Sequence, residues 1–251
     1  MNQQKVNFTN SRNLKLAGIL LDPPDRTKSI VVVCHGLSGG KEGRGRAIEM
    51  GKELTGRGWS SLLFDFAGNG ESEGVFKDLT LSGQIDDLNR AVDWCLDQGF
   101  TRIITHGRSF GGTTVICQAA HDRRVSGVCT WAAPTDLHRL ILGIVDPTQS
   151  DEEDLALGKG TETVRLKKNF LSDLEKYDLT VYSAMISPRP FLVIHGTADL
   201  SVPPMEAITI YNAAEQPKRL ALIEGADHQF SQHYKKVWEI LFEWLERNFP
   251  V

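Results

Sequence analysis

A serine flanked by glycines offers the clearest nucleophile in the chain. Residues 107–111 read Gly-Arg-Ser-Phe-Gly, the pattern G-x-S-x-G, with Ser109 at its centre. A β-rich run, residues 102–106, comes directly before the motif, and a helix-like run, residues 112–120, follows it. A strand-to-helix turn this tight strains the serine backbone and holds the hydroxyl at a helix start, where the helix dipole favours a developing anion. The alternative, in which Ser109 only caps the helix, has to be weighed against the rest of the chain.

Two further groups complete the chemistry that such a serine needs. A serine hydroxyl is a weak nucleophile at neutral pH, so it requires a neutral imidazole as base and a carboxylate that orients the imidazole. Asp199 follows the β-rich run 191–195, and His228 follows the run 219–224. Because each group lies just past a strand end, all three can converge on one edge of a parallel sheet. We therefore predict Ser109 as nucleophile, His228 as general base and Asp199 as the orienting acid.

Nearby residues provide the alternatives to these partners. His233 lies close to His228, but at the start of the last helix-like run. Asp227 is the alternative acid, although its position next to His228 would point it away from the ring. Four other polar residues near strand ends are expected to support or cap loops instead: His35, His106, Asp65 and Asp136.

The elements that must position these groups follow an alternating pattern. The chain has eight β-rich runs: residues 5–9, 14–21, 30–34, 60–66, 102–106, 125–131, 191–195 and 219–224. The first two, separated by a turn-like stretch, predict an antiparallel hairpin, and helix-like segments separate the others. In the helix predicted at 79–98 the charged face, including Asp87, is expected to lie in water, whereas Trp238 and Trp244 in the last helix are expected in the core. The pattern predicts an α/β fold with a mostly parallel sheet and helices on both faces.

The alternation stops between Pro134 and Pro188. We predict one domain over residues 1–251, with a cap insertion at about 135–187 that contains an acidic run, 151–154, and a helical stretch at 164–177. The apolar residues of the insertion are expected to roof a pocket over the serine: Leu140, Ile141, Leu142, Ile144, Val145, Phe170 and Leu171. Open α/β sheets place their sites at the carboxyl ends of the strands, which is where such a cap would lie.

The composition limits the kind of partner. The chain has 251 residues, of which 41% are hydrophobic, and a formal net charge of −4. This charge provides no basic face for nucleic acid, and no window approaches the roughly 18 apolar residues of a membrane span. We expect a small-molecule substrate, no nucleic acid and no membrane span. The oligomeric state stays open, a homodimer included.

Cysteine, histidine and glycine spacings predict no redox, metal or nucleotide site. Four cysteines are scattered through apolar runs without C-x-x-C spacing: Cys34, Cys95, Cys117 and Cys129. We expect buried free thiols and a cytoplasmic protein. The Gly-Asn-Gly turn at 68–70 does not match the dinucleotide motif, because Gly74 falls one residue late. No metal and no cofactor are expected.

Several motifs resemble those of the α/β-hydrolase superfamily, and the resemblance extends over the whole chain. Residues 35–37 resemble its oxyanion loop, residues 64–72 its D-x-R-G-x-G-x-S turn and residues 195–199 its acid loop. The likeness is strongest to small capped esterases of the acylglycerol-lipase and cinnamoyl (feruloyl) esterase kind. It implies that the backbone N–H groups of Leu37 and Phe110 form the oxyanion hole. Arg108 differs from the histidine that is commonest at its position, and Ala67 from the usual arginine.

The function predicted from these residues is hydrolysis of carboxylic esters through an acyl-enzyme on Ser109. The insertion alternates its apolar residues with charged ones, unlike a lipase that docks on lipid, so short-to-medium or aromatic acyl esters are expected. Two alternatives stay open. One is a serine peptidase or amidase, with carboxylates of the run 151–154 holding a free amino terminus, and the other is a non-catalytic binding protein of the same fold.

Overall fold

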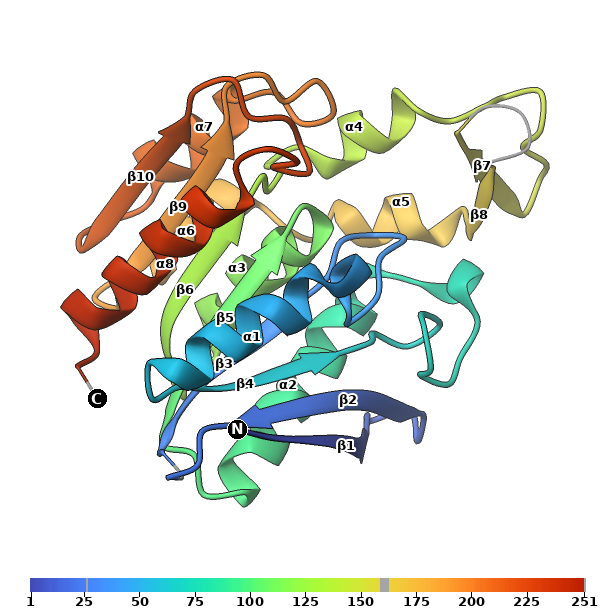
Figure 1. The fold of residues 1–251 in the computed structure, drawn as a ribbon. Helices are drawn as coiled ribbons and strands as arrows, with labels where there is room; N and C mark the ends of the chain where they lie inside the picture. The colour runs from blue at the N-terminus through green and yellow to red at the C-terminus, as the bar shows by residue number, and fades with distance from the viewer. Residues whose placement is uncertain (26, 159–162, 251) are drawn as a thin grey trace.

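An eight-stranded sheet forms the centre of the molecule (Figure 1). The computed structural model describes residues 1–25, 27–158 and 163–250. The strands of the sheet are β1 (Asn2–Thr9), β2 (Lys15–Asp22), β3 (Ser29–Cys34), β4 (Ser60–Phe64), β5 (Arg102–Arg108), β6 (Val125–Trp131), β9 (Phe191–Gly196) and β10 (Lys218–Ile223). They lie in the order β1-β2-β4-β3-β5-β6-β9-β10. Each predicted strand is present, and the α/β fold is confirmed.

The direction of the strands explains where a site can form. β1 and β2 make the predicted antiparallel hairpin, and β2 also runs antiparallel to β4. From β4 to β10 every neighbouring pair is parallel. β3 and β4 are buried along their whole length, as their unbroken apolar sequence requires. The carboxyl ends of β5, β9 and β10 therefore meet at one edge, where Ser109, Asp199 and His228 follow them.

Helices cover both faces of the sheet (Figure 1). The near face in this view carries α1 (Arg46–Gly56) and α8 (Tyr234–Asn248). The apolar residues of the two helices, including Trp238 and Trp244 of α8, form one buried cluster. Those two tryptophans are core residues, as predicted. The other face carries α2 (Leu81–Asp97) and α3 (Phe110–His121), together with α6 (Leu179–Met185) and α7 (Met205–Ala213). Two 3-10 turns, η1 (Gly43–Gly45) and η2 (Phe76–Asp78), lie in the loops before α1 and α2.

The insertion is only partly helical. It contains α4 (Leu137–Leu142), β7 (Asp154–Leu157), β8 (Val164–Lys167) and α5 (Asn169–Leu174), and continues into α6. The prediction of a helix from residue 164 is wrong, because residues 164–167 pair antiparallel with β7 and the helix begins only at Asn169. A helical period could not reveal a strand partner that lies elsewhere in the chain. In Figure 1, α4 and α5 lead from the carboxyl ends of the strands out to this hairpin.

Asp87 departs from its predicted exposure. Its side chain is 1% exposed, and it accepts hydrogen bonds from Asn10 Nδ2 (2.6 Å) and from the backbone N–H of Ala67 (2.8 Å). It therefore ties α2 to the β1–β2 turn and to the loop after β4. Burial raises the pKa of this carboxyl above its ordinary value, against the hydrogen bonds that lower it. The helical pattern identified the face of α2 but not the loops that cover it.

Two other observations concern the whole chain. The four cysteines are free and buried, as predicted, and burial raises the pKa of the Cys34 thiol well above its ordinary value. Within the described ranges, no helix has both the length and the apolar character that crossing a bilayer demands.

Candidate active site

Ser109 occupies a sharp turn between β5 and α3. Its backbone has φ 55° and ψ −123°, a conformation that non-glycine residues rarely adopt and that typically costs about 1–3 kcal/mol. The surrounding contacts hold it there, since its N–H donates to the carbonyl of Trp131 (2.8 Å) and its carbonyl accepts from Gly112 (2.8 Å). Only glycine fits at position 107, because a Cβ there would overlap the carbonyl oxygen of Gly111. The turn projects the hydroxyl beyond the end of the strand.

The structure brings Ser109, His228 and Asp199 together. Ser109 Oγ lies 3.2 Å from His228 Nε2, and His228 Nδ1 lies 2.8 Å from Asp199 Oδ2. In this arrangement Nδ1–H donates to the carboxylate, and Nε2 can accept the hydroxyl proton. The other oxygen, Asp199 Oδ1, accepts from the backbone N–H groups of Ser201 (2.9 Å) and Val202 (2.8 Å). Both carboxylate oxygens are thus held in place.

His195 is a neighbour of the acid that the sequence pattern did not single out. It is fully buried at the end of β9, and its Nε2 lies 3.2 Å from Asp199 Oδ2 and 3.0 Å from the carbonyl of Val202. Burial by itself would raise the pKa of Asp199, but the hydrogen bonds from His195, His228 and Val202 hold it well below its ordinary value. Asp199 is therefore a carboxylate throughout the neutral range. In the sequence, the contact between His195 and Asp199 was signalled only by the spacing of four residues between them.

The alternative partners lie elsewhere. Asp227 is exposed, and its Oδ1 accepts from the backbone N–H of Ser231 (2.8 Å). His233 is the residue just before α8. His228 lines the pocket around Ser109. Asp227 and His233 are not among the described residues that line it.

The loop after β3 packs against the serine. A Cβ placed on Gly36 would lie 3.4 Å from the Cβ of Ser109, so this backbone, with Leu37 next in line, runs beside the hydroxyl. His35 holds the loop through two bonds, since its Nδ1 donates to the carbonyl of Gly36 (2.7 Å) and its Nε2 accepts from the N–H of Phe66 (3.1 Å). Burial lowers the pKa of His35 and favours the neutral ring that this pair of bonds requires.

Asp65 and Asp136 support loops, as predicted. Asp65 Oδ1 accepts from the backbone N–H of Lys41 (2.6 Å), and its Oδ2 pairs with the Lys41 ammonium (2.6 Å). The same ammonium lies 2.7 Å from Glu71 and, with Lys5, lowers the pKa of that carboxyl to about 2. Asp136 caps α4 by accepting from the N–H of Arg139 (2.9 Å).

A pocket of about 780 Å³ surrounds Ser109 and His228. One part of its wall is apolar and is formed by Leu37, Phe110, Pro134, Leu137, Leu140, Ile141 and Ile144. Another part is basic and is formed by Lys41, Arg44, Arg46 and Arg108. None of the lining residues within the described ranges is an aspartate or a glutamate.

The insertion contributes fewer residues to this wall than the sequence predicted. Leu140, Ile141 and Ile144 line the pocket, whereas Leu142 is 50% exposed and faces away, because one helical turn cannot present all of them to the same side. Phe170 lies behind the wall instead. It is fully buried, and its ring centroid is 5.7 Å from that of Phe110.

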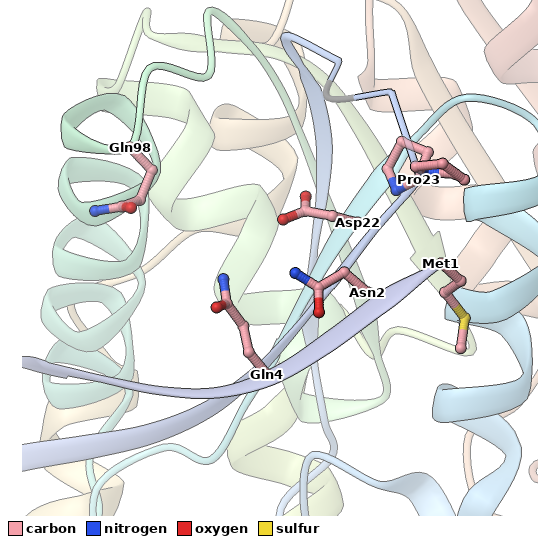
Figure 2. A pocket seen from close by; sticks show the side chains of 7 residues that line it. Met1, Asn2, Gln4, Asp22, Pro23 and Gln98 are labelled. Atoms are coloured by element: carbon pink, nitrogen blue, oxygen red, sulfur yellow. The ribbon is translucent and has the colours of Figure 1, made fainter.

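A second hollow, of about 370 Å³, lies at the opposite end of the sheet (Figure 2). Its wall is formed by Met1, Asn2, Gln4, Asp22, Pro23, Pro24 and Gln98. Asp22 ends β2 and accepts from the hydroxyl of Ser60, the first residue of β4, so the hollow adjoins the amino ends of the parallel strands. These residues do not provide a nucleophile with a neighbouring base. In the described part of the chain, no group of three or more histidine, cysteine, aspartate or glutamate side chains could hold a metal ion.

The sheet order and the serine turn define the class of protein. The chain is an α/β hydrolase, as the resemblance implied. The model of the prolyl oligopeptidase family matches residues 54–250, and the chain belongs to that family.

Similar proteins include an uncharacterised relative and solved esterases. The uncharacterised protein YfhR of Salmonella typhimurium is 26% identical over 220 residues, which cover 86% of this chain and 70% of the relative. The esterase domain of a Rhodothermus marinus protein is 26% identical, with a TM-score of 0.79 and coverage of 98% of this chain and 99% of that one. Est1E from Butyrivibrio proteoclasticus, solved with bound ferulic acid, has a TM-score of 0.87 at 22% identity, with 98% and 100% covered, and shows the shared fold.

Proposed function

We propose that the protein is a carboxylic-ester hydrolase with Ser109 as nucleophile, His228 as general base and Asp199 as the orienting acid. The observation that carries the proposal is the unbroken hydrogen-bonded series from Ser109 Oγ to His228 (3.2 Å) and from His228 to Asp199 (2.8 Å). A neutral imidazole held by an ionised carboxylate is the arrangement that activates a serine hydroxyl.

The reaction follows from these positions. Ser109 Oγ forms a bond to the acyl carbon while its proton passes to His228 Nε2. The tetrahedral intermediate collapses, and the departing alkoxide takes that proton from His228 and leaves as the alcohol. A water molecule then attacks the acyl carbon while its proton passes to His228. As this second tetrahedral intermediate collapses, the bond from the acyl carbon to Ser109 Oγ breaks, His228 returns the proton to Ser109 Oγ, and the carboxylic acid leaves.

The developing oxyanion needs donors on the side away from His228. We assign this role to the backbone N–H groups of Leu37 and Phe110. The contact of Gly36 with Ser109 and the position of Phe110 as first residue of α3 support the assignment. Two such donors in a site shielded from water typically contribute several kcal/mol to transition-state stabilisation, about 2.7–4 kcal/mol for each one removed.

Short-to-medium or aromatic acyl groups suit the pocket. Its volume of about 780 Å³ lies within the range of sites that enclose a small ligand, and its apolar wall from Phe110 to Ile144 provides a surface for an acyl chain. The hairpin that extends the insertion is edged by charged residues such as Asp151 and Arg165, which form an ion pair at 3.2 Å. Such a surface fits a substrate dissolved in water better than a lipid interface.

The peptidase alternative has less support. A peptidase that binds a free amino terminus needs a carboxylate in the pocket, and none of the described lining residues provides one. The acidic run is used locally instead, since Asp151 Oδ1 accepts from the backbone N–H groups of Glu153 (3.0 Å) and Asp154 (2.8 Å). These contacts favour an ester over an amino-terminal peptide.

The test compares esters with amides of the same acyl group. Wild-type protein should react with a fluorophosphonate probe and hydrolyse p-nitrophenyl butyrate faster than butyryl p-nitroanilide. Ser109→Ala should keep its circular dichroism spectrum but lose the probe reaction and about 10⁴-fold or more of the ester rate, because the nucleophile is gone. A Ser109→Ala rate within about tenfold of wild type would overturn the assignment, and a wild type that reacts with neither ester nor probe would favour the binding-protein alternative.

A further inference from the structure

Three arginines line the pocket without a carboxylate partner. Arg44 lies in η1, Arg46 begins α1, and Arg108 immediately precedes Ser109. Among the ion pairs within 4.0 Å that the described residues form, none involves any of these three guanidinium groups. A protein with a net charge of −4 thus gathers unpaired positive charge beside its nucleophile.

Lys41, the fourth cation of this wall, differs from the arginines because it has carboxylate partners. Lys41 is buried between Asp65 (2.6 Å) and Glu71 (2.7 Å), so its charge is balanced by the protein itself. A buried cation needs partners of this kind, because an unpaired charge in a low-dielectric interior is costly. Arg44 is exposed and Arg46 is half-buried, and neither forms such an ion pair within the described residues, so both charges stay accessible from the pocket.

The contacts of the arginines leave donors available for a ligand. Arg46 stacks over the ring of Tyr234 at 4.8 Å, and its hydrogen bonds to the carbonyls of Gln229 and Ser231 are long, at 3.4 Å. Arg108 donates one N–H, from Nη1, to the side-chain oxygen of Gln229. A guanidinium group has five N–H donors, so most of them remain unused in these two contacts.

The charges act on one another. Burial lowers the pKa of Arg108 from its ordinary value, and the positive charges of Arg44 and Arg46 lower it further. Two opposing charges act on these arginines: Asp199, which raises the pKa of Arg108, and Asp227, whose pKa Arg46 helps to lower. Asp199 is already held by His228 and His195, and Asp227 is exposed, so neither neutralises the arginines. An anion entering the pocket would relieve this repulsion.

The basic and apolar walls belong to opposite faces of the sheet. The basic wall is continuous with α1 and α8, whose residues Met50, Tyr234 and Trp238 also line the pocket. The apolar wall comes from the start of α3 and from α4, on the other face. Ser109 stands in the chain between Arg108 of the basic wall and Phe110 of the apolar wall. An ester bound across the serine would thus place an apolar part on one side and an anionic part on the other.

We propose that the substrate is an ester whose alcohol part carries an anionic group, a carboxylate or a phosphate, and that Arg44, Arg46 and Arg108 bind this group while the acyl part lies against α4. The substrate class rests on the proposed esterase function, whereas the anion site itself rests on the arginines alone. Arginine suits such a role because its planar fork binds carboxylate and phosphate through paired, charge-assisted hydrogen bonds.

The test uses butanoyl esters of phenols that carry either an anionic or a neutral substituent in the para position. The wild type should hydrolyse 4-(butanoyloxy)benzoate or 4-(butanoyloxy)phenyl phosphate with a kcat/KM about tenfold or more above that of neutral 4-(butanoyloxy)benzamide. The larger of the two ratios identifies the preferred anion. Raising the salt concentration from 0.05 to 0.5 M, on the order of the range over which screening becomes strong, should reduce the preference. Equal kcat/KM values for the charged and neutral esters would overturn the proposal.

Variants separate anion binding from support of the His228 loop. Arg44→Gln is the most informative change, since no hydrogen bond joins Arg44 to that loop within the described residues. It should lower the ratio of anionic to neutral kcat/KM about threefold or more, given that an exposed charge is screened. Lys52→Gln removes the same charge from an exposed position on α1 and should leave the ratio unchanged. Gln229→Ala disturbs the Arg108 contact but keeps all three charges, so it should also preserve the ratio.

Two results would show that the arginines serve only the fold. One is an Arg44→Gln ratio equal to that of the wild type. The other is an equal loss on all esters in Arg46→Gln and Arg108→Gln, which would mean that these residues position His228 without binding the substrate.

A binding measurement tests the anion site independently of the esterase function. Calorimetry should detect 4-hydroxybenzoate or phenyl phosphate binding to the wild type more tightly than 4-hydroxybenzamide, and less tightly to Arg44→Gln. Anion binding without hydrolysis of any ester would contradict the esterase function and leave the anion site standing. Hydrolysis of all esters alike, with no difference in binding, would leave the esterase function and overturn the anion site.

Discussion

The edge of the sheet and the insertion at 135–187 are built in different ways. At the edge, backbone hydrogen bonds join the loops that carry the site: Ser109 N–H donates to Trp131 (2.8 Å), and Ala198 N–H donates to Ala226 (3.0 Å). The insertion consists of short elements, with six residues in α4 and six in α5, and exposes apolar side chains such as Leu142. Rigid backbone contacts at the edge suit groups that must meet within hydrogen-bond distance.

Side-chain contacts join the insertion to the body, and its buried apolar residues share one cluster with α2 and α3. Asp173 of α5 accepts from the backbone N–H (2.8 Å) and the hydroxyl of Ser82 at the start of α2, and Phe170 packs against Phe110. Under the proposed function, the edge of the sheet carries the reaction chemistry and the insertion contributes to substrate selection. Changes at the edge should abolish turnover, whereas changes in the insertion should alter stability or acyl preference.

The largest effect is expected at the acid. In Asp199→Asn an amide replaces a carboxylate that holds both His228 and His195, so the imidazole loses its orienting charge and kcat should fall about 10⁴-fold with little change in substrate binding. Asp227→Asn is the matched control, because its remaining carbonyl oxygen can still accept from Ser231, and its rate should stay near that of the wild type. Steady-state kinetics on one ester measures both variants. The reverse pattern would mean that Asp227 is the acid.

The second prediction concerns how firmly the insertion is attached. Phe170→Ala should lower the free energy of unfolding by about 3–5 kcal/mol, because a fully buried ring against Phe110 is replaced by a cavity. Leu142→Ala, at a side chain that is 50% exposed, should cost less than about 1 kcal/mol. Urea denaturation measures both values. A loss below about 1 kcal/mol in Phe170→Ala as well would show that the insertion unfolds apart from the sheet.

The third prediction tests acyl selection. Ile144 and Leu142 are similarly exposed, at 45% and 50%, but only Ile144 lines the pocket. Ile144→Ala should lower kcat/KM for p-nitrophenyl hexanoate relative to acetate about tenfold, since a longer acyl chain loses an apolar contact. Leu142→Ala should keep the wild-type profile. If the two variants shifted the profile equally, the pocket wall would not be what selects the acyl group.

The smallest effect is a pH dependence that arises in the sheet. Burial lowers the pKa of His106, in β5, to about 3. The unfolded chain, with a histidine pKa of about 6.5, therefore binds a proton that the folded protein excludes, and stability that is complete above about pH 6.5 is lost as the pH falls.

For this one group the loss should be about 1 kcal/mol between about pH 6.5 and 5.5. Urea denaturation across that interval measures the free energy of unfolding of the wild type and of His106→Gln. The difference between the two values gives the contribution of His106 to the pH dependence of stability. A His106→Gln slope equal to that of the wild type would show that His106 does not titrate as its burial requires.

The sequence by itself determined the sheet and the placement of its chemistry. Eight runs of β-forming residues became the eight strands of the sheet. Strands such as β3 and β4 are buried on both faces, which requires a continuous apolar sequence, so they could be found locally. The G-x-S-x-G turn and the two strand ends before Asp199 and His228 were visible for the same reason. Parallel strands bring those ends together whatever the intervening helices contain, so three distant residues could be predicted to meet. Their catalytic role stays a prediction.

Only the tertiary structure decided which side chains from separate segments touch. The burial of Asp87 under the β1–β2 turn and the pairing of β7 with β8 both join residues whose own surroundings in the sequence show no sign of the partner. The same holds for Arg44 in η1 and Arg108 at the end of β5, which share one pocket wall. A periodic pattern records which face of an element is covered. It does not record what covers it, because that depends on the path of the whole chain.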